Sequence, residues 1–382
     1  MEKRKFCGKD ISLLGFGLMR LPKVSEKSFD IDYAASSKLI DHAMANGINY
    51  YDTAYTYGGS EAFAGNALSK YPRDSYFLAT KCPPWKLKNA ADFERIFAEQ
   101  LERCKTDYFD FYLVHNLAEE LKRAGKNEEY FDNFVNLGMC EMLRRKKAEG
   151  KIRHVGFSFH GTIALLQKLV DYYEWDFAQI QLNYIDWTAT DAKTQYEILT
   201  RKNIPLIIME PLRGGMLANL SPESAKILKQ ENPDASIASW GVRYAASFPN
   251  VITILSGMNA MEQLTDNIAT MDSFQPVADC DRELLYKAAS VYSQSGAIPC
   301  TGCRYCMPCP VGVDIPRIFS VYNYYRLVNF RIPFDNGYST LSENEKASAC
   351  IQCGQCVEKC PQHITIPEFM QEIDEFARAA PE

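Results

Sequence analysis

Two groups of residues in this 382-residue chain have types and spacings suited to chemistry. One group is formed by eight of the thirteen cysteines, which are crowded into the last quarter of the chain. They form two runs, Cys300-x2-Cys303-x2-Cys306-x2-Cys309-Pro310 and Cys350-x2-Cys353-x2-Cys356-x3-Cys360-Pro361. This spacing is too tight and too regular for a disulfide framework, so we interpret these cysteines as metal ligands.

Three cysteines at x2 spacing can bind three irons of a 4Fe-4S cubane, and in two-cluster ferredoxins the fourth iron takes a cysteine from the other motif. On this rule one cluster takes Cys300, Cys303, Cys306 and Cys360, and the other takes Cys350, Cys353, Cys356 and Cys309. Zinc is the alternative, but its sites use separated pairs of cysteines rather than triplets. The first run has two residues before its last cysteine where three are common. The assignment of Cys309 to the cluster of the other run, which we call crossover, is therefore open to test.

The other group combines a carboxylate, a phenol, an ammonium and an imidazole. Its members are Asp52, Tyr57, Lys81 and His115, in the runs Asp52-Thr-Ala-Tyr-Thr-Tyr57-Gly58, Ala79-Thr80-Lys81 and Leu113-Val114-His115-Asn116. This set suits proton delivery to a carbonyl oxygen, because an adjacent ammonium stabilises a phenolate and lowers the usual tyrosine pKa of ~10. Asp52 would keep Lys81 charged, and a neutral His115 would orient the carbonyl. The hydride must come from a nicotinamide, since no side chain supplies one.

The elements that position these residues follow a βα pattern, with short apolar runs alternating with amphipathic ones. The strand candidates are residues 12–19, 48–53, 76–81, 109–116, 152–159, 177–184, 205–211 and 251–258, and helical patterns cover 33–45, 90–104, 133–149 and 236–247. Eight units predict an α/β fold of the (β/α)8 TIM barrel type. A doubly wound sheet is the weaker alternative, because no GxGxxG follows the first strand. Barrels of this type carry their chemistry at the C-terminal ends of the strands, where Asp52, Lys81 and His115 fall.

At these residues the chain resembles the aldo-keto reductase superfamily, in which the same tetrad occurs at the ends of these strands with the Asp and Tyr five apart. The resemblance covers most of residues 1–272. It implies an NAD(P)H-dependent aldo-keto reductase-like oxidoreductase that reduces a small-molecule aldehyde or ketone, with Tyr57 as the general acid. Two alternatives remain. Tyr55 lies two residues from Tyr57, and on a loop at a strand end either could be a packing residue. Lys81 and Asp52 could form only a structural ion pair at the barrel rim.

The resemblance also implies how the nicotinamide cofactor is held. It assigns the nicotinamide end to Ser158, Gln179 and Met209, the pyrophosphate loop to residues 211–215 with Arg213, and the adenosine end to Gly257, Gln263, Asp266 and Asn267. Phe159 replaces the asparagine that usually follows the serine, and Met209 replaces a tyrosine found in many members. Members that prefer NADPH carry cations at the positions of Gly257 and Gln263, but residues 251–271 contain no Lys or Arg. NADH and NADPH are therefore both open.

Residues 310–349 separate the two cysteine runs by more than a compact bacterial ferredoxin needs, which predicts a small α-helical ferredoxin-like domain. We expect one helix over 315–328 and an acidic closing helix with Glu368 and Glu372. The run from Cys300 to Asp314 resembles a subgroup of aldo-keto reductases with a C-terminal two-cluster iron-sulfur segment. The expected domains are a barrel at 1–275, a linker at 276–297 and a dicluster domain at 298–382.

Charge and hydropathy exclude other classes. There are 42 Lys and Arg against 48 Asp and Glu, a formal net charge of -6, and no basic run, which argues against nucleic acid as a partner. No stretch reaches the ~18 apolar residues of a membrane span, and the first eight residues lack an apolar signal core. We therefore expect a cytoplasmic protein with no membrane partner.

Two other functions remain as alternatives. The barrel could bind nicotinamide mainly as a sensor while the clusters act as an electron carrier to a redox partner protein. Each cluster passes one electron, whereas a hydride carries two, and no flavin signature is present to convert between them. Metal-assisted hydrolysis in the barrel lacks a His and carboxylate ligand cluster at the strand ends. Residues 117–132 form a polar insertion that we expect to cover the site.

Overall fold

A computed structural model describes residues 1–25, 28, 30–117 and 129–379. The chain forms two compact units. One combines Met1–Pro211 with Ser239–Ala278, and the other combines Leu212–Ala238 with Asp279–Glu382. Within the described residues, none of the helices has the length and apolar character that crossing a membrane requires.

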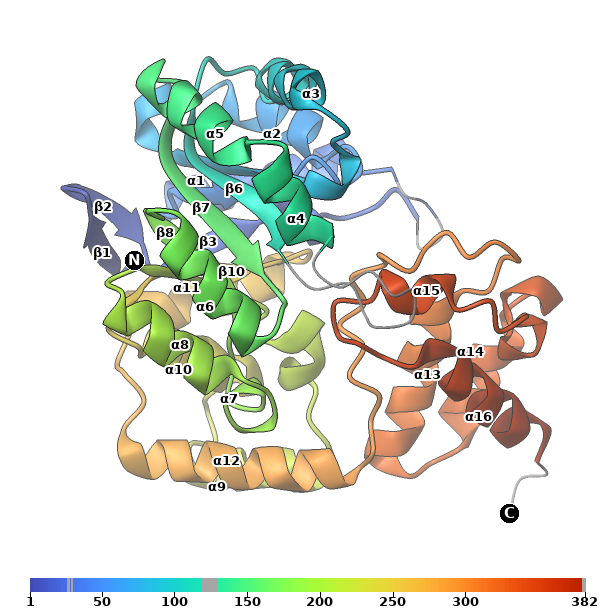
Figure 1. The fold of residues 1–382 in the computed structure, drawn as a ribbon. Coiled ribbons are helices and arrows are strands. Elements are labelled where there is room, and N and C mark those ends of the chain that lie inside the picture. The colour runs from blue at the N-terminus through green and yellow to red at the C-terminus, as the bar shows by residue number, and fades with distance from the viewer. Residues whose placement is uncertain (26–27, 29, 118–128, 380–382) are drawn as a thin grey trace. The chain divides into compact units, whose positions relative to one another are not determined.

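The first unit contains a closed barrel of eight parallel strands (Figure 1). In order around the barrel they are β10 (Val251–Ser256), β3 (Leu14–Gly17), β4 (Tyr50–Asp52), β5 (Phe77–Cys82), β6 (Phe109–Leu117), β7 (Ile152–Phe159), β8 (Phe177–Gln181) and β9 (Leu206–Met209). Every strand lies within or overlaps a run expected from the sequence. The (β/α)8 prediction is therefore confirmed.

Helices follow the strands along the chain. In this unit they are α1 (Tyr33–Ala45), α2 (Ser60–Leu68), α3 (Ala90–Arg103), α4 (Glu129–Asn136), α5 (Met139–Ala148), α6 (Ile163–Tyr172), α7 (Asp186–Ala189), α8 (Ala192–Arg201), α10 (Ile237–Ala246) and α11 (Met261–Asp272). Side-chain caps start several of them, as where Asp32 accepts a hydrogen bond from the Ala35 N–H at 2.9 Å. The single helix expected over 133–149 was wrong. The chain breaks between α4 and α5 at Gly138, whose φ of +62° is left-handed.

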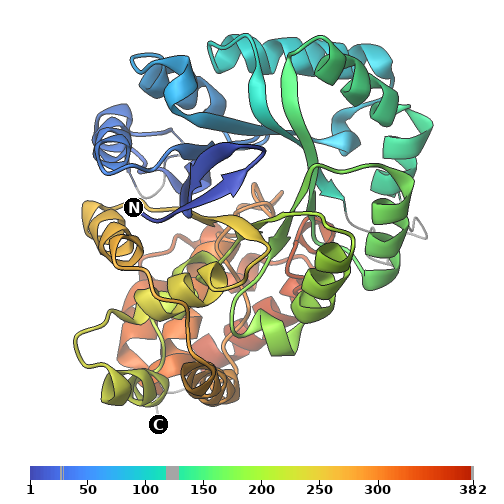
Figure 2. The same cartoon turned by 90° about the vertical axis from the view of Figure 1, so that its left-hand side faces the viewer.

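An antiparallel hairpin that the sequence analysis missed precedes the barrel. It consists of β1 (Lys3–Phe6) and β2 (Lys9–Ser12), so the expected strand over 12–19 is divided between β2 and β3. Figure 2 shows this hairpin across the end of the barrel that faces the viewer. Phe6 and Ile11 join the barrel core, where the Phe6 and Phe111 ring centroids are 5.5 Å apart. The hairpin therefore closes the barrel end opposite the C-terminal ends of the strands.

The described residues of the second unit form helices, turns and loops and include no strand. Its α-helices are α9 (Pro222–Glu231), α12 (Asp279–Gln294), α13 (Ile315–Val328), α14 (Ile332–Ser339), α15 (Gln355–Glu358) and α16 (Ile366–Arg378), with short 3₁₀ turns that include η4 (Arg213–Ala218). Ile318, Phe319 and Ile373 form part of its core, and cysteines of both runs pack against that core. The expected helix at 315–328 and the acidic closing helix are both present. Helix α12 occupies most of the residues expected as a linker.

Candidate functional site

Asp52 and Lys81 form a buried ion pair at the C-terminal ends of two neighbouring strands. Strands β4 and β5 are hydrogen-bonded to each other, with Asp52 opposite Ala79. The Lys81 ammonium donates to the Asp52 carboxylate and, at 2.9 Å, to the Thr53 carbonyl oxygen. The side chains are 1% and 4% exposed. Burial raises the pKa of Asp52 and lowers the pKa of Lys81, while the attraction between the two charges opposes both shifts.

Tyr57 lies over this pair, on the turn that follows β4. The Lys81 Nζ atom is 4.8 Å from the centroid of the Tyr57 ring. Tyr57 is only half-buried, so among the tetrad it is the side chain with access to solvent. Tyr55 is engaged elsewhere, because its hydroxyl donates to Glu99 at 2.8 Å and the Arg103 guanidinium is 4.6 Å from its ring. The geometry therefore favours Tyr57 over Tyr55 as the phenol that acts with Lys81.

His115, on β6, completes the tetrad. Its ring centroid is 5.7 Å from that of Tyr57, with the rings nearly perpendicular, and its Nδ1 atom is 3.4 Å from the Thr56 hydroxyl. Burial lowers the pKa of His115 well below its usual value, and the charge of Lys81 lowers it further. The imidazole is therefore neutral near pH 7 and able to donate a hydrogen bond from one nitrogen. The loop expected to cover the site, residues 117–132, lies outside the described residues at 118–128.

The depressed pKa of His115 predicts a measurable pH dependence of stability. Below about pH 6.5 the unfolded chain binds a proton at His115 that the folded chain does not, so folding free energy is lost as the pH falls. The contribution approaches about 1.4 kcal/mol per pH unit for one proton. We expect His115→Gln to reduce the slope of unfolding free energy against pH between pH 7 and 5, as measured by urea unfolding. A slope equal to that of the unsubstituted protein would contradict the assignment of a buried neutral imidazole.

The residues expected at the nicotinamide end lie on adjacent strands. Ser158 on β7 pairs in register with Gln179 on β8, and both are buried. The Ser158 hydroxyl accepts from the Asn116 N–H at 2.8 Å, and the Gln179 amide donates to Asp52 at 3.3 Å. Met209 ends β9 and is half-buried. These three strand ends, β7 to β9, are consecutive around the barrel.

The residues expected at the adenosine end follow β10. Gly257 comes directly after this strand, and Gln263, Asp266 and Asn267 lie on α11. The Gln263 amide oxygen accepts from the Asn259 N–H at 2.9 Å, and buried Asn267 donates to the Ser256 hydroxyl at 3.1 Å. Asn267 therefore holds α11 against β10. Arg213, expected at the pyrophosphate, lies in the other unit and is 9% exposed.

The two cysteine runs lie together in the second unit. Burial raises the pKa of the Cys306 thiol, and Cys303, Cys300 and Cys360 are among the neighbours that raise it further. Burial likewise raises the pKa of Cys356 to about 11, with further contributions from Cys350, Cys353 and Cys309. These are the two sets expected from the crossover rule, although Cys356 is also among the neighbours of Cys306. The assignment of individual ligands stays a prediction.

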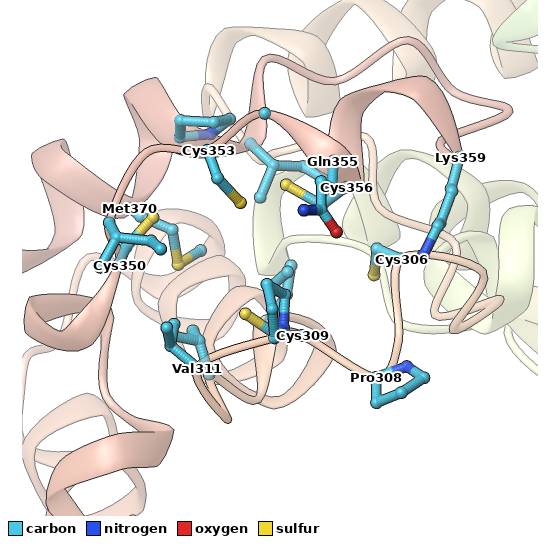
Figure 3. Close-up of a pocket in the computed structure, with 17 residues that line it drawn as sticks. Cys306, Pro308, Cys309, Val311, Cys350, Cys353, Gln355, Cys356, Lys359 and Met370 are labelled. Atoms are coloured by element: carbon cyan, nitrogen blue, oxygen red, sulfur yellow. The ribbon is translucent and has the colours of Figure 1, made fainter.

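Thiols of both cysteine runs meet at one place in the second unit. Five cysteines line one hollow that is partly open to solvent: Cys306, Cys309, Cys350, Cys353 and Cys356. Figure 3 shows the sulfur atoms of Cys309, Cys353 and Cys356 turned toward this space. Within the described residues, no three side chains of His, Cys, Asp or Glu are grouped closely enough to hold one metal ion.

Comparison with known proteins agrees with this geometry. A sequence profile described as the aldo/keto reductase family matches residues 13–279. The chain belongs to the aldo/keto reductase family. A profile described as a 4Fe-4S dicluster domain matches residues 299–365. Together they confirm the expected oxidoreductase class and the expected cofactor classes, a nicotinamide dinucleotide and two 4Fe-4S clusters.

Individual relatives cover most of this aldo/keto reductase. L-Galactose dehydrogenase of Arabidopsis thaliana is 24% identical over 307 residues, which cover 74% of this chain and 91% of the relative. NADH-specific methylglyoxal reductase of Escherichia coli (strain K12) is 25% identical over 338 residues, covering 76% and 98%. The solved structure of an aldo-keto reductase from Klebsiella pneumoniae in complex with NADPH has a TM-score of 0.60 at 19% identity, covering 76% of this chain and 96% of that one. This last likeness shows the fold alone.

Sequence reasoning missed Glu61, a buried carboxylate that supports the tetrad of this aldo/keto reductase. Glu61 on α2 accepts from Thr80 at 2.7 Å and from Gln100 at 2.8 Å. Burial raises the pKa of Glu61, and its negative charge in turn raises the pKa of Lys81. The carboxylate thus helps to keep Lys81 protonated. The sequence feature that could have revealed Glu61 is its position as the one charged residue of α2.

Two further residues near the site were missed because their neighbours are distant in sequence. The Trp85 ring lies 5.4 Å from that of His115 and forms part of the surroundings of the tetrad. Arg20 packs its aliphatic stem beside Gly257 and forms a 2.8 Å ion pair with Glu210. A cation is therefore present beside the position of Gly257 although residues 251–271 contain none. It comes from the turn after β3, which no pattern within 251–271 could reveal.

Proposed function

We propose that the barrel reduces an aldehyde or ketone by hydride transfer, with Tyr57 as the general acid. The observation that carries the proposal is the Lys81 ammonium, which is fixed by the buried Asp52 and stands 4.8 Å from the Tyr57 ring centroid. A cation at this position stabilises the phenolate that remains once Tyr57 has given its proton to the carbonyl oxygen. Asp52 and Glu61 keep that cation charged in spite of its burial.

His115 and the cofactor residues prepare the substrate for this step. The neutral His115 donates a hydrogen bond to the carbonyl oxygen and holds it beside the Tyr57 hydroxyl. Ser158 and Gln179 would hold the nicotinamide amide, and Met209 would offer the ring a soft apolar surface. Bound nicotinamide supplies the hydride to the carbonyl carbon. Arg213, in the turn at 211–215, is assigned to the pyrophosphate by the resemblance alone, because most of this turn belongs to the other compact unit.

The cofactor is proposed as NADH or NADPH. Gly257 and Gln263 offer no charge to a 2′-phosphate. Arg20 packs its aliphatic stem beside Gly257, and its guanidinium already pairs with Glu210. Among the relatives, one is named an NADH-specific reductase and a structural neighbour is solved with NADPH. Both nucleotides therefore belong in the test.

A steady-state assay of the cluster-loaded protein tests the proposed reaction. Aldehydes, ketones and 2-oxoaldehydes are each supplied with NADH and with NADPH, and nucleotide oxidation is followed at 340 nm. We expect turnover with at least one carbonyl class, and a strong preference for one of the two nucleotides. Tight nucleotide binding with negligible oxidation across the whole panel would contradict the carbonyl reductase assignment.

The dicluster domain favours a second candidate, an electron carrier or redox sensor that serves a partner protein. Cys353 is exposed, so one edge of its expected cluster reaches the surface of the second unit. Anaerobic mixing of the oxidised, cluster-loaded protein with NADH or NADPH, without any carbonyl, tests this candidate. Bleaching of the cluster absorbance with a new EPR signal supports electron exchange with the nucleotide. Unchanged clusters with bound nucleotide contradict it. The redox partner, the domain limits at 275 and 298 and the cytoplasmic location stay predictions.

A further inference from the structure

Gln100 occupies a position in α3 that helix packing alone would give to an apolar side chain. The other buried side chains of this helix are Phe93, Ile96 and Phe97, which form one stripe with Gln100 at helical spacing. Gln100 is 0% exposed, and a buried amide is stable only where its N–H groups and its oxygen have hydrogen-bond partners. The partners of Gln100 therefore decide what this residue does in the molecule.

The Gln100 amide joins three segments of the barrel unit. Its nitrogen donates to the Glu61 carboxylate of α2 at 2.8 Å and to the Lys81 carbonyl oxygen of β5 at 3.1 Å. The same nitrogen is 3.1 Å from the hydroxyl oxygen of Thr80, which itself donates to Glu61. The Gln100 oxygen accepts from the Tyr112 hydroxyl of β6 at 2.6 Å. One side chain thus links α2, β5 and β6.

Each of these three segments carries or adjoins a member of the tetrad. Lys81 belongs to β5 itself, and His115 lies three residues after Tyr112 on β6. Tyr57 lies on the turn before α2, and its carbonyl oxygen accepts from the N–H of Ser60, the first residue of that helix, at 2.7 Å. Helices α2 and α3 pack against each other (Figure 1). The amide therefore lies where the supports of the phenol, the ammonium and the imidazole meet.

The charge of Glu61 fixes the orientation of this amide. The Arg103 guanidinium, which is 39% exposed, lies 3.3 Å from the second oxygen of the Glu61 carboxylate. An ionised carboxylate only accepts hydrogen bonds, so the amide must turn its nitrogen toward Glu61 and its oxygen toward the Tyr112 hydroxyl. In this orientation the other N–H is directed to the Lys81 carbonyl oxygen, which also only accepts. The main chain of Lys81 is therefore held by a side chain that has one allowed orientation.

We propose that Gln100 is a positioning residue for carbonyl reduction, which holds the Lys81 main chain in register with the elements that carry Tyr57 and His115. This inference rests on the proposed function, in which Tyr57 gives its proton to the carbonyl oxygen beside Lys81. Gln100 is fully buried, so it acts on the placement of the ammonium and not through contact with the substrate. A misplacement of about 1 Å is enough to lower a rate by a large factor. Loss of the amide thus lowers turnover and leaves nucleotide binding in place.

Gln100→Leu tests the proposal in the cluster-loaded full chain. Leucine continues the apolar stripe of α3, but it has no N–H for Glu61 and Lys81 and no oxygen for Tyr112. We expect kcat for carbonyl reduction to fall by at least about tenfold, while the nucleotide dissociation constant changes by less than about twofold. Steady-state kinetics and nucleotide titration measure the two quantities. An unchanged kcat in a folded, nucleotide-binding variant would overturn the inference.

Phe97→Leu is the matched control, because it weakens the same face of α3 without removing a hydrogen bond. The Phe97 ring centroid lies 5.2 Å from that of Tyr112, in the same layer as Gln100. We expect this variant to unfold at a lower urea concentration than the unsubstituted protein and to keep its kcat. A fall in kcat equal to that of Gln100→Leu would assign the effect to lost stability and would overturn the positioning role.

Tyr112→Phe provides a second variant should Gln100→Leu fail to fold. It removes the hydroxyl that orients the Gln100 oxygen and keeps the ring in the core. We expect the same separation, a lower kcat with an unchanged nucleotide dissociation constant, but a smaller effect because the N–H contacts of Gln100 remain. An unchanged kcat in this variant would overturn the inference. Absence of turnover in the unsubstituted protein would instead overturn the proposed function, on which the positioning role depends.

Discussion

Tyr57→Phe is expected to lower carbonyl reduction by at least about a hundredfold, the range that general acids contribute, while changing the nucleotide dissociation constant by less than about twofold. The substitution removes one hydroxyl and keeps the ring that packs 5.7 Å from His115 and over Lys81. The buried Asp52–Lys81 pair does not depend on that hydroxyl, because Lys81 also donates to the Thr53 carbonyl oxygen and Asp52 also accepts from Gln179. Steady-state kinetics and nucleotide titration separate the two effects.

Tyr55→Phe is the matched control. It removes a hydroxyl from the same turn, but that hydroxyl donates to Glu99 at 2.8 Å, away from the tetrad. We expect this variant to keep turnover near the unsubstituted level and to lose a small amount of stability, about 1 kcal/mol for one hydrogen bond. If Tyr57→Phe kept a tenth or more of the turnover, or if Tyr55→Phe were the inactive variant, the general acid would have to be reassigned.

Much of the barrel could be predicted because strands buried on both faces give continuous apolar runs. Strand β6, for example, is apolar from Phe111 to Val114 and buried along that length. The hairpin of β1 and β2 was missed because its residues are mostly polar and exposed, and only Phe6 and Ile11 reach the core. The division of the helix expected at 133–149 depends on the backbone at Gly138, which hydrophobic periodicity does not report.

The tetrad could be predicted because three of its members lie on strands whose ends a barrel brings together. The residues that support it could not. Glu61, Trp85 and Arg20 contact residues that are distant in the sequence. Arg20 and Gly257, for example, are 237 positions apart. Their partners are decided by tertiary packing rather than by a local pattern. The same holds for the segment 212–238, whose sequence reads as an ordinary barrel connection although it packs with α12.

Two double variants show which cysteines share a cluster. In crossover, Cys309 and Cys360 each bind the cluster of the other run; in local ligation, each run binds its own cluster. Under crossover, Cys303 and Cys360 hold the same cluster, so replacing both with alanine spares the second cluster. Replacing Cys303 and Cys309 instead damages both clusters. If each run held its own cluster, these two results would be exchanged.

Iron content and EPR spectra read the result directly. Two cubanes carry about eight irons per chain and one carries about four. We expect about four irons in Cys303→Ala/Cys360→Ala and almost none in Cys303→Ala/Cys309→Ala. Cys360 is a neighbour of the Cys306 thiol and Cys309 is a neighbour of the Cys356 thiol, which favours this outcome, although Cys356 also lies among the neighbours of Cys306. Retention of about four irons by the Cys303/Cys309 variant, with loss of both clusters from the Cys303/Cys360 variant, would establish local ligation and would place Cys309 in one set with Cys300, Cys303 and Cys306.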